Sequence, residues 1–215
     1  GLESWTPEEG SPQGAVISPM LSNIYLDPLD QQMAQKGIEM VRYADDFVIL
    51  CRSQVEAVEA LEQVRRWTAS AGLSLHPEKT RIMDATQAGG FDFLGYHFER
   101  GRKWPRRKSL DKLQDAIRAK TPRRSSGESL QATITDLNGT LVGWFGYFKH
   151  SAPRTFRMLD GWIRMRLRSI LRNRAHGRGR GRGEDTHRWP NAFFAERGLY
   201  SLVTAHALAC QSSPR

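Results

Sequence analysis

Two segments in the first half of the chain have apolar residues at helical spacing. The first follows a loop rich in glycine, proline and serine, and we predict Ser18 as its N-cap and Pro19 as its first residue. Its expected apolar face comprises Met20, Leu21, Ile24, Tyr25 and Leu29. In the second, apolar residues recur every three positions from Val55 to Trp67. Gly72 is predicted to end this helix, because glycine readily adopts a left-handed conformation.

The segment between these helices has the pattern of a β-hairpin. Residues 39–43 and 47–51 are β-prone and flank an Ala-Asp-Asp sequence. This arrangement predicts a hairpin with Asp45 and Asp46 at its tip. A further apolar run, residues 91–98, is predicted to be one strand. The first half is therefore expected to combine helices with short strands.

The second half of the chain is predicted to be helical. Apolar residues fall at steps of three and four over residues 130–148, and again over about residues 156–174. The first of these helices contains three glycines, each of which weakens a helix by about 1 kcal/mol relative to alanine. We expect close backbone packing to offset this cost at Gly139, Gly143 and Gly146. The second helix is expected to present a phosphate-binding stripe formed by Arg157, Arg164, Arg168 and Arg172.

The remainder of the chain combines a repeat with an apolar tail. The Gly-Arg repeat of residues 176–183 has low complexity and is expected to be flexible. The tail contains side chains that we expect to dock on the helical core, namely Trp189, Phe193, Phe194, Leu199 and Tyr200.

The predicted fold class is α+β, an antiparallel sheet with helices followed by a helical part. The predicted domains are residues 1–98, 99–175 and 176–215.

Charge is distributed unevenly between the two halves. The chain has 32 Lys and Arg against 23 Asp and Glu, a net charge of +9. Residues 1–98 contain 7 basic and 14 acidic side chains, whereas residues 99–215 contain 25 basic and 9 acidic ones. A half this basic is drawn to a polyanion, so nucleic acid is the first expected partner. The plainer alternative is a generally basic soluble domain.

Several classes of protein are not expected. No stretch approaches the roughly 18 uninterrupted apolar residues of a membrane span, and the first residues lack the pattern of a signal peptide. Cys51 and Cys210 are far apart, which disfavours a zinc site or a disulfide scaffold. A reducing cytoplasm is the expected location, with no membrane partner.

Asp45 and Asp46 are the candidate catalytic and metal-binding residues. Hard divalent cations prefer carboxylate oxygens, and a tight turn holds two carboxylates clear of the strands. A two-metal site can clamp the attacking and leaving oxygens of a phosphoryl displacement, which is the usual chemistry of nucleotidyl transfer. The plainer alternative is structural, because aspartate is common in turns.

Neighbouring motifs favour the catalytic interpretation. Around the hairpin, four motifs occur in order: GSPQG (10–14) with ISP (17–19) and LSNIYL (21–26), RYADDFV (42–48), GLSLHPEKT (72–80) and FDFLGY (91–96). They resemble the catalytic blocks of reverse transcriptases. Four later motifs resemble the maturase-specific thumb of group II intron-encoded proteins: LN (137–138), GWFGYF (143–148), LDGWI (159–163) and RLR (166–168). The resemblance covers about residues 5–175, and the tail also resembles the ending of bacterial members.

This resemblance implies a polymerase-type palm followed by a helical thumb, with a role for each matching residue. Asp45 would ligate two magnesium ions, and Asp46 would be a second or outer ligand. The residues expected to approach nucleotide, primer or template are Gln13, Gly14, Tyr43, Ala44, Lys79, Leu94 and Gly95. The residues expected to bind RNA are Arg106, Arg107 and Lys108 together with the four arginines of the stripe. The plainer alternatives are a strand aromatic at Tyr43, a surface cation at Lys79 and a bulge at Gly95.

One part of the family pattern is missing. Polymerases of this family carry a further metal-binding aspartate and nucleotide-holding fingers in earlier blocks, and this chain begins after them. Asp27 and Asp30 are interpreted as the solvated face of a helix and not as replacement ligands. We therefore expect the chain to be the carboxyl part of a longer protein, as a fragment, a split gene product or a remnant. We also expect it to be inactive as a polymerase by itself.

The function that the resemblance implies is RNA-directed DNA synthesis with intron maturation, in a bacterial cytoplasm. The expected cofactor is magnesium. The expected partners are group II intron RNA, an RNA template with a DNA primer, and deoxynucleoside triphosphates. Two alternatives remain open. One is a non-enzymatic RNA-binding maturase whose palm is only a scaffold, and the other is a reverse transcriptase of a phage-defence or CRISPR-associated system.

Overall fold

The protein has two compact units. The computed structural model describes residues 17–122, 127–177, 179–181 and 183–212. The chain divides between the units after Asp84, whereas the domain boundary after residue 98 stays a prediction. Helices and small antiparallel sheets together confirm the predicted α+β class. Among the residues described, no helix has both the length and the apolar character needed to cross a membrane.

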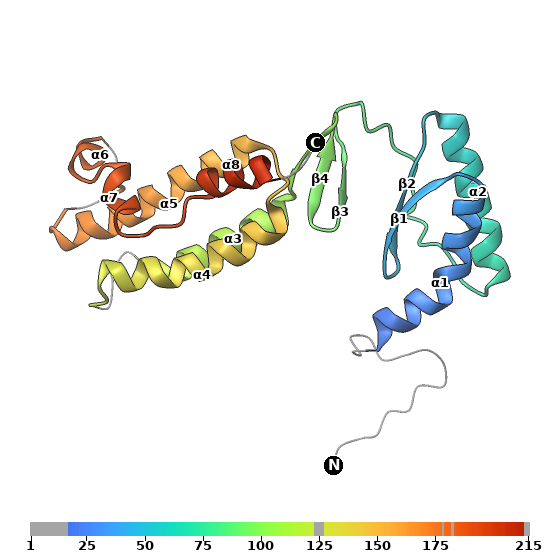
Figure 1. The fold of residues 1–215 in the computed structure, drawn as a ribbon, viewed down its shortest axis with the longest axis horizontal. Helices are drawn as coiled ribbons and strands as arrows, with labels where there is room; N and C mark the ends of the chain where they lie inside the picture. The colour runs from blue at the N-terminus through green and yellow to red at the C-terminus, as the bar shows by residue number, and fades with distance from the viewer. Residues whose placement is uncertain (1–16, 123–126, 178, 182, 213–215) are drawn as a thin grey trace, which may run out of the picture. The chain divides into compact units, whose positions relative to one another are not determined.

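The first unit is a hairpin with two helices on one of its faces (Figure 1). Its elements are α1 (Ser18–Gln35), β1 (Glu39–Tyr43), β2 (Asp46–Leu50) and α2 (Gln54–Ser70). Side chains alternate along each strand, so Met40, Phe47 and Ile49 share the face that meets the helices. Leu29 and Met33 of α1 are fully buried against this face. The unit therefore has one small core between the hairpin and its helices.

Helix α1 starts where the sequence indicated, but a different face is buried. Ile17 is the N-cap, one residue before the predicted Ser18. Most of the predicted apolar face is wrong, because it is exposed in the structure: Met20, Leu21, Ile24 and Tyr25. The buried residues of the helix are Leu26, Leu29 and Met33. Only the second half of α1 lies over the hairpin, so apolar residues in its first turns meet no core.

Helix α2 shows the same effect of tertiary contact. Ser53 caps it by accepting a hydrogen bond from the Glu56 amide at 3.2 Å, and Gly72, with φ +69°, confirms the predicted end. The predicted spacing of three is wrong at its start, where Val55 is exposed. The buried positions are Ala60, Val64 and Thr68. A spacing of four follows one face more closely, because three residues fall short of a full helical turn.

The second unit begins with a three-stranded sheet. Its elements are β3 (Phe91–Phe93), β4 (Tyr96–Glu99), β5 (Arg102–Pro105), α3 (Arg107–Lys120), α4 (Leu130–Phe148), α5 (Pro153–Arg174), α6 (Glu184–Arg188), α7 (Asn191–Ala195) and α8 (Leu202–Ser212). The prediction of one strand over residues 91–98 is wrong, because Leu94 and Gly95 make a turn that pairs β3 with β4. Tyr96 on β4 packs its ring against Phe148 of α4, with centroids 5.0 Å apart. The sheet is therefore joined to the helices through aromatic contacts.

Helices α3, α4 and α5 enclose the main core, as the sequence predicted for the second half. Leu137 and Leu141 of α4 are fully buried, and Leu167 of α5 is as well. The expectation of close packing at the glycines of α4 is wrong. Gly139, Gly143 and Gly146 are exposed, and apart from the backbone of its own helix a Cβ at any of them would have no described atom within 4 Å.

The tail docks on α5, which confirms that prediction, and α8 runs alongside α5 (Figure 1). Phe194 and Leu202 are fully buried in the core. The flexibility of the Gly-Arg repeat stays a prediction; within the repeat, Gly181 is buried and donates its N–H to Ser169 Oγ at 3.0 Å. A Cβ at this position would lie 2.4 Å from Arg168 Cβ. Gly181 can therefore pack against α5 because it has no side chain.

Candidate functional site

The candidate site is the turn between β1 and β2. The strand register pairs Tyr43 with Asp46, so the turn itself consists of Ala44 and Asp45 alone. This corrects the prediction that both aspartates form the tip, since Asp46 is the first residue of β2. Two-residue turns suit the right-handed twist of hairpin strands when the first turn residue has a positive φ. Ala44 has φ +53°, a left-handed conformation that costs a residue other than glycine about 1–3 kcal/mol.

The two carboxylates are of the type that holds a hard divalent cation. Asp45 and Asp46 are both exposed, and neither forms an ion pair with another of the described residues. Exposed carboxylate oxygens are the donors that magnesium prefers. In the described ranges no group of three or more His, Cys, Asp and Glu side chains has the geometry to hold a metal ion. The pair therefore offers two carboxylate donors for a divalent cation at one end of the hairpin.

Arg42 is a residue of this site that sequence reasoning missed. Its side chain is only 10% exposed and forms an ion pair with Asp30 of α1. The hydrogen bond with Asp30 raises the pKa of the guanidinium above its ordinary value. Asp30 is half-buried, which corrects its assignment to a solvated face, whereas Asp27 is exposed as expected. Arg42 lies inside the RYADDFV motif, but helical spacing alone could not show that Asp30 turns toward the hairpin.

The residues predicted to approach the nucleotide are only partly brought together. Tyr43 is 67% exposed and lies directly opposite Asp46 on the open face of the hairpin. Lys79 is exposed in the turn of residues 77–79. Gln13 and Gly14 lie outside the described residues. Tyr43, Ala44 and both aspartates thus form one local group, and the roles of these residues stay predictions.

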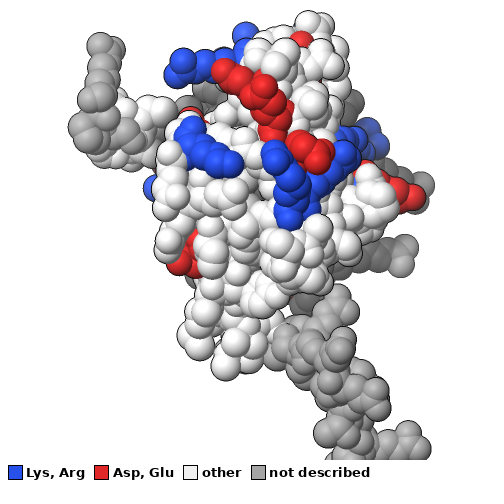
Figure 2. All heavy atoms as spheres, turned by 90° about the vertical axis from the view of Figure 1, so that its right-hand side faces the viewer, with Lys and Arg blue, Asp and Glu red and all other residues white. Residues whose placement is uncertain are grey.

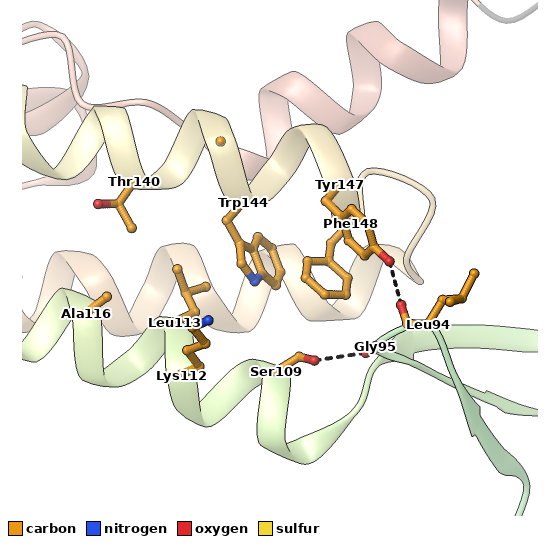
Figure 3. Close-up of a pocket in the computed structure, with 11 residues that line it drawn as sticks. Leu94, Gly95, Ser109, Lys112, Leu113, Ala116, Thr140, Trp144, Tyr147 and Phe148 are labelled. Atoms are coloured by element: carbon orange, nitrogen blue, oxygen red, sulfur yellow. Dashed lines mark hydrogen bonds between the residues drawn. The ribbon is translucent and has the colours of Figure 1, made fainter. Parts of the chain in front are cut away.

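The turn of Leu94 and Gly95 belongs to the second unit and is fixed by three hydrogen bonds, of which Figure 3 shows those from Tyr147 and Ser109. The Leu94 carbonyl accepts from Tyr147 Oη at 2.7 Å. The Gly95 carbonyl accepts from Ser109 Oγ at 3.1 Å and from the Arg106 amide at 2.9 Å. The two φ values, +46° and +80°, are those of a turn and not of the bulge considered above. These residues border a pocket of about 440 Å³ between α3 and α4.

The basic cluster that follows β5 is accessible in part. Arg107 has an 89% exposed side chain, and its Nε donates to both carboxylate oxygens of Asp111 at 3.1 Å. Lys108 is exposed, whereas Arg106 is half-buried. The face of the molecule shown in Figure 2 has no such cluster of one sign: Lys and Arg side chains lie there next to Asp and Glu, among mostly uncharged residues. The basic cluster therefore presents two exposed cations, Arg107 and Lys108.

The arginine stripe of α5 is not a single exposed surface, which corrects that expectation. Arg157 is exposed and Arg164 is half-buried, 3.7 Å from Asp160. Arg168 is 5% exposed, and Arg172 donates to Asp185 at 2.6 Å. The physical reason is that the tail covers this part of α5. Within the stripe, the side chain that is open to a phosphate is that of Arg157.

Arg168 binds the tail directly. Its Nε donates to the Trp189 carbonyl at 2.8 Å, and its Nη2 donates to Asn191 Oδ1 at 2.8 Å. Burial lowers the pKa of this guanidinium, and the nearby charge of Arg164 acts in the same direction. The guanidinium also lies 5.3 Å from the centre of the Phe194 ring. Arg168 is thus part of the fold and not of the solvent-facing surface.

Asp160 is a second residue whose role the sequence did not reveal. It is 3% exposed and accepts hydrogen bonds from Ser201 Oγ at 2.8 Å and from the Leu202 amide at 3.1 Å. A carboxylate at the start of a helix satisfies free N–H groups and complements the helix dipole. Asp160 therefore caps α8. Its position in the LDGWI motif was visible, but its partners lie about 40 residues away.

Comparisons with known proteins match both units. The model of the family described as reverse transcriptase (RNA-dependent DNA polymerase) matches residues 3–98. The model described as group II intron, maturase-specific domain matches residues 110–189. The two matches together cover most of the chain, and the second favours an intron-encoded protein over one of a defence system.

Three relatives share parts of the chain. Protein YkfC of Escherichia coli (strain K12) is 31% identical, with 44% of this chain and 33% of that protein covered. The retrovirus-related Pol polyprotein from type-1 retrotransposable element R1 2 of Nasonia vitripennis is 35% identical, with 34% and 20% covered. The Gag-Pro-Pol polyprotein of Mason-Pfizer monkey virus is 26% identical, with 48% and 6% covered. The chain thus spans a third or less of the length of these relatives.

The family matches agree with the geometry of both units. The acidic hairpin lies in the segment that matches reverse transcriptases, and helices α4 and α5 with all but the first three residues of α3 lie in the segment that matches the maturase-specific domain. The chain therefore belongs to the family of group II intron reverse transcriptases and maturases.

Proposed function

We propose that this protein takes part in copying RNA into DNA and in the maturation of a group II intron. The observation that carries the proposal is the hairpin, in which Asp45 and Asp46 lie exposed and adjacent at one end of a two-stranded sheet. The match of this segment to reverse transcriptases supports the proposal. In this reaction the 3′-hydroxyl of a DNA primer attacks the α-phosphate of a deoxynucleoside triphosphate, and pyrophosphate leaves.

Each residue of the hairpin has a proposed part in that reaction. Asp45 and Asp46 would hold magnesium, with a further ligand from outside this pair. When bound, the metal supplies stabilisation of the negative charge that develops on the reacting phosphate. The exposed ring of Tyr43 would contact the primer terminus or the nucleotide base, because it lies on the same side of the hairpin as Asp46. Lys79 would neutralise charge on the triphosphate.

The second unit would hold the nucleic acid. The exposed side chains of Arg107, Lys108 and Arg157 would contact phosphates of the intron RNA and of the template-primer duplex. Such contacts recognise the backbone and the A-form shape more than the sequence of bases. The turn of Leu94 and Gly95 would support the primer strand, since three hydrogen bonds keep its backbone in one conformation.

Primer extension tests this proposal in the full-length protein. Asp45→Asn is expected to abolish extension on an RNA template, because it removes a metal ligand. The same variant is expected to bind intron RNA with unchanged affinity, because Asp45 makes no phosphate contact. Asp27→Asn is the matched control, since Asp27 is an exposed carboxylate of the same unit, and it is expected to extend normally. Full activity of Asp45→Asn would refute the assignment of the site.

A second candidate function is RNA binding in splicing without polymerase activity. The match of residues 110–189 to the maturase-specific domain favours it independently of the hairpin. A splicing assay with the intron RNA separates the two functions. Asp45→Asn is expected to leave splicing unchanged, whereas loss of positive charge at Arg107 and Lys108 is expected to reduce it. A wild-type protein that assists splicing but extends no primer would establish the second function alone.

A further inference from the structure

We propose that Arg42 is a positioning residue, which sets the orientation of the Asp45 carboxylate by fixing the backbone of the turn to α1. This inference rests on the proposed function, because it assigns Arg42 a part in the same site. It goes beyond that proposal in naming a residue that touches neither metal nor nucleotide and yet controls metal binding.

One guanidinium joins three points of the first unit. Arg42 Nη1 donates to the Ala44 carbonyl at 2.8 Å and to Asn23 Oδ1 at 2.9 Å. Its Nε donates to the two carboxylate oxygens of Asp30 at 2.9 and 3.0 Å, and its Nη2 also donates to Asp30. Asn23 and Asp30 both lie on α1. The turn is therefore connected to a helix through a single, largely buried side chain.

The bond to Ala44 is the one that reaches Asp45. The carbonyl of Ala44 and the N–H of Asp45 belong to one planar peptide unit, so fixing the carbonyl fixes the peptide that precedes the Cα of Asp45. Ala44 has φ +53°, a conformation that a residue with a side chain keeps only when its surroundings determine it. The hydrogen bond from Arg42 supplies such a constraint. Without it, rotation of this peptide would redirect the Asp45 side chain.

The contacts need the shape of arginine as well as its charge. A guanidinium has five N–H donors in a rigid plane, and here four of the contacts go to different oxygens: two on Asp30, one on Asn23 and one on Ala44. A lysine ammonium has three donors at one point and cannot span the same oxygens. Arg42→Lys therefore keeps the charge but loses the connection between the helix and the turn.

Steady-state primer extension by the full-length protein, with magnesium varied at saturating nucleotide and template-primer, tests the inference. Arg42→Lys is expected to raise the half-saturating magnesium concentration by about 10-fold or more, as is typical when the partner of a metal ligand is lost. Excess magnesium is expected to restore much of kcat. The KM for the template-primer is expected to stay unchanged. Arg65→Lys is the control, because Arg65 also faces an acidic residue of the same unit but lies on α2, and it should behave as wild type.

A purely structural role predicts a different result. It would lower the Tm and the yield of folded protein, while the folded fraction would keep the wild-type response to magnesium. Asn23→Ala is a second test in case Arg42→Lys does not fold. Asn23 is exposed, and removing its side chain leaves the ion pair between Arg42 and Asp30 intact. It is expected to shift the magnesium response in the same direction by a smaller factor. Wild-type magnesium responses in both Arg42→Lys and Asn23→Ala would overturn the inference.

The outcomes also separate this inference from the proposed function. If Asp45→Asn is inactive while Arg42→Lys matches wild type, the proposed function stands and the positioning role fails. If Asp45→Asn extends primers normally, the proposed function itself fails. Asp30→Asn adds a further check: combined with Arg42→Lys, it is expected to cause little additional change, because both variants break one network.

Discussion

Replacing Arg168 by glutamine is expected to destabilise the second unit without lowering its affinity for RNA. Arg168 is one of four arginines that share helical spacing on α5, yet it is 5% exposed and bonded to the tail. Glutamine is also a good helix former, so helix propensity changes little. The substitution therefore tests whether the arginine serves the fold or a bound phosphate.

The magnitude follows from the contacts that are lost. Hydrogen bonds from a charged donor contribute about 1.5–3 kcal/mol each, and Arg168 makes two, to the Trp189 carbonyl and to Asn191. The contact with the Phe194 ring adds about 0.5–2 kcal/mol. Removing a buried charge recovers desolvation energy, and glutamine can still donate one hydrogen bond. The expected net loss is about 2–4 kcal/mol in the free energy of unfolding.

Two measurements on the same variants decide the matter. Urea unfolding, followed by far-UV circular dichroism and tryptophan fluorescence, gives the free energy of unfolding. Filter binding to intron RNA at several salt concentrations gives the salt slope. Arg157→Gln is the control, because Arg157 is exposed, and it is expected to change stability by less than about 0.5 kcal/mol and lower the slope by up to about one unit. A stable Arg168→Gln variant with a reduced slope would refute the reasoning.

Two further predictions concern local packing and thiol chemistry. Gly181→Ala is expected to lower the free energy of unfolding by about 1–3 kcal/mol, because its Cβ would collide with α5, whereas Gly139→Ala is expected to raise it by up to about 1 kcal/mol. Urea unfolding checks this opposite sign, and two changes of equal sign would contradict it. Iodoacetamide at neutral pH is expected to modify the exposed Cys210 before Cys51, because burial and the charge of Glu56 raise the pKa of the Cys51 thiol. Peptide mass spectrometry at short times measures both rates, and faster labelling of Cys51 would contradict the prediction.

Local patterns predicted the elements but not the faces that they bury. The hairpin around Asp45 follows from strand alternation and turn chemistry, both of which act over a few residues. The register of the two strands does not follow from the same local signals, because a loop of two or three residues fits the same sequence. For this reason Asp46 was predicted at the tip, whereas the structure has it in β2. In α1, Met20 and Ile24 satisfy helical spacing as well as Leu29 and Met33 do. Which pair is buried depends on which part of α1 the hairpin covers, and the sequence of α1 alone does not determine this.

The candidate site shows the same limit. A row of arginines at helical spacing looks the same whether it faces a phosphate or the protein's own carbonyl groups. The partners of Arg168, at Trp189 and Asn191, lie more than 20 residues away and are joined to it only by tertiary folding. Arg42 was visible within its motif, but its connection to Asp30 required the packing of α1 against β1. Whether a charged side chain is bonded within the fold or is open to a ligand therefore depends on residues that are distant in the sequence.

The docking of the tail on α5 has a consequence for synthesis on the ribosome. Phe194 and Leu202 complete a core whose earlier part includes Leu159 and Ile163 of α5. At about 5–20 residues per second, roughly 2–9 s pass between the synthesis of Leu159 and that of Leu202. During this interval the apolar side of α5 has no cover from the tail. The nascent second unit therefore exposes apolar side chains of α5 at this stage, and its core is complete only when residues 194–202 have been synthesised and can fold.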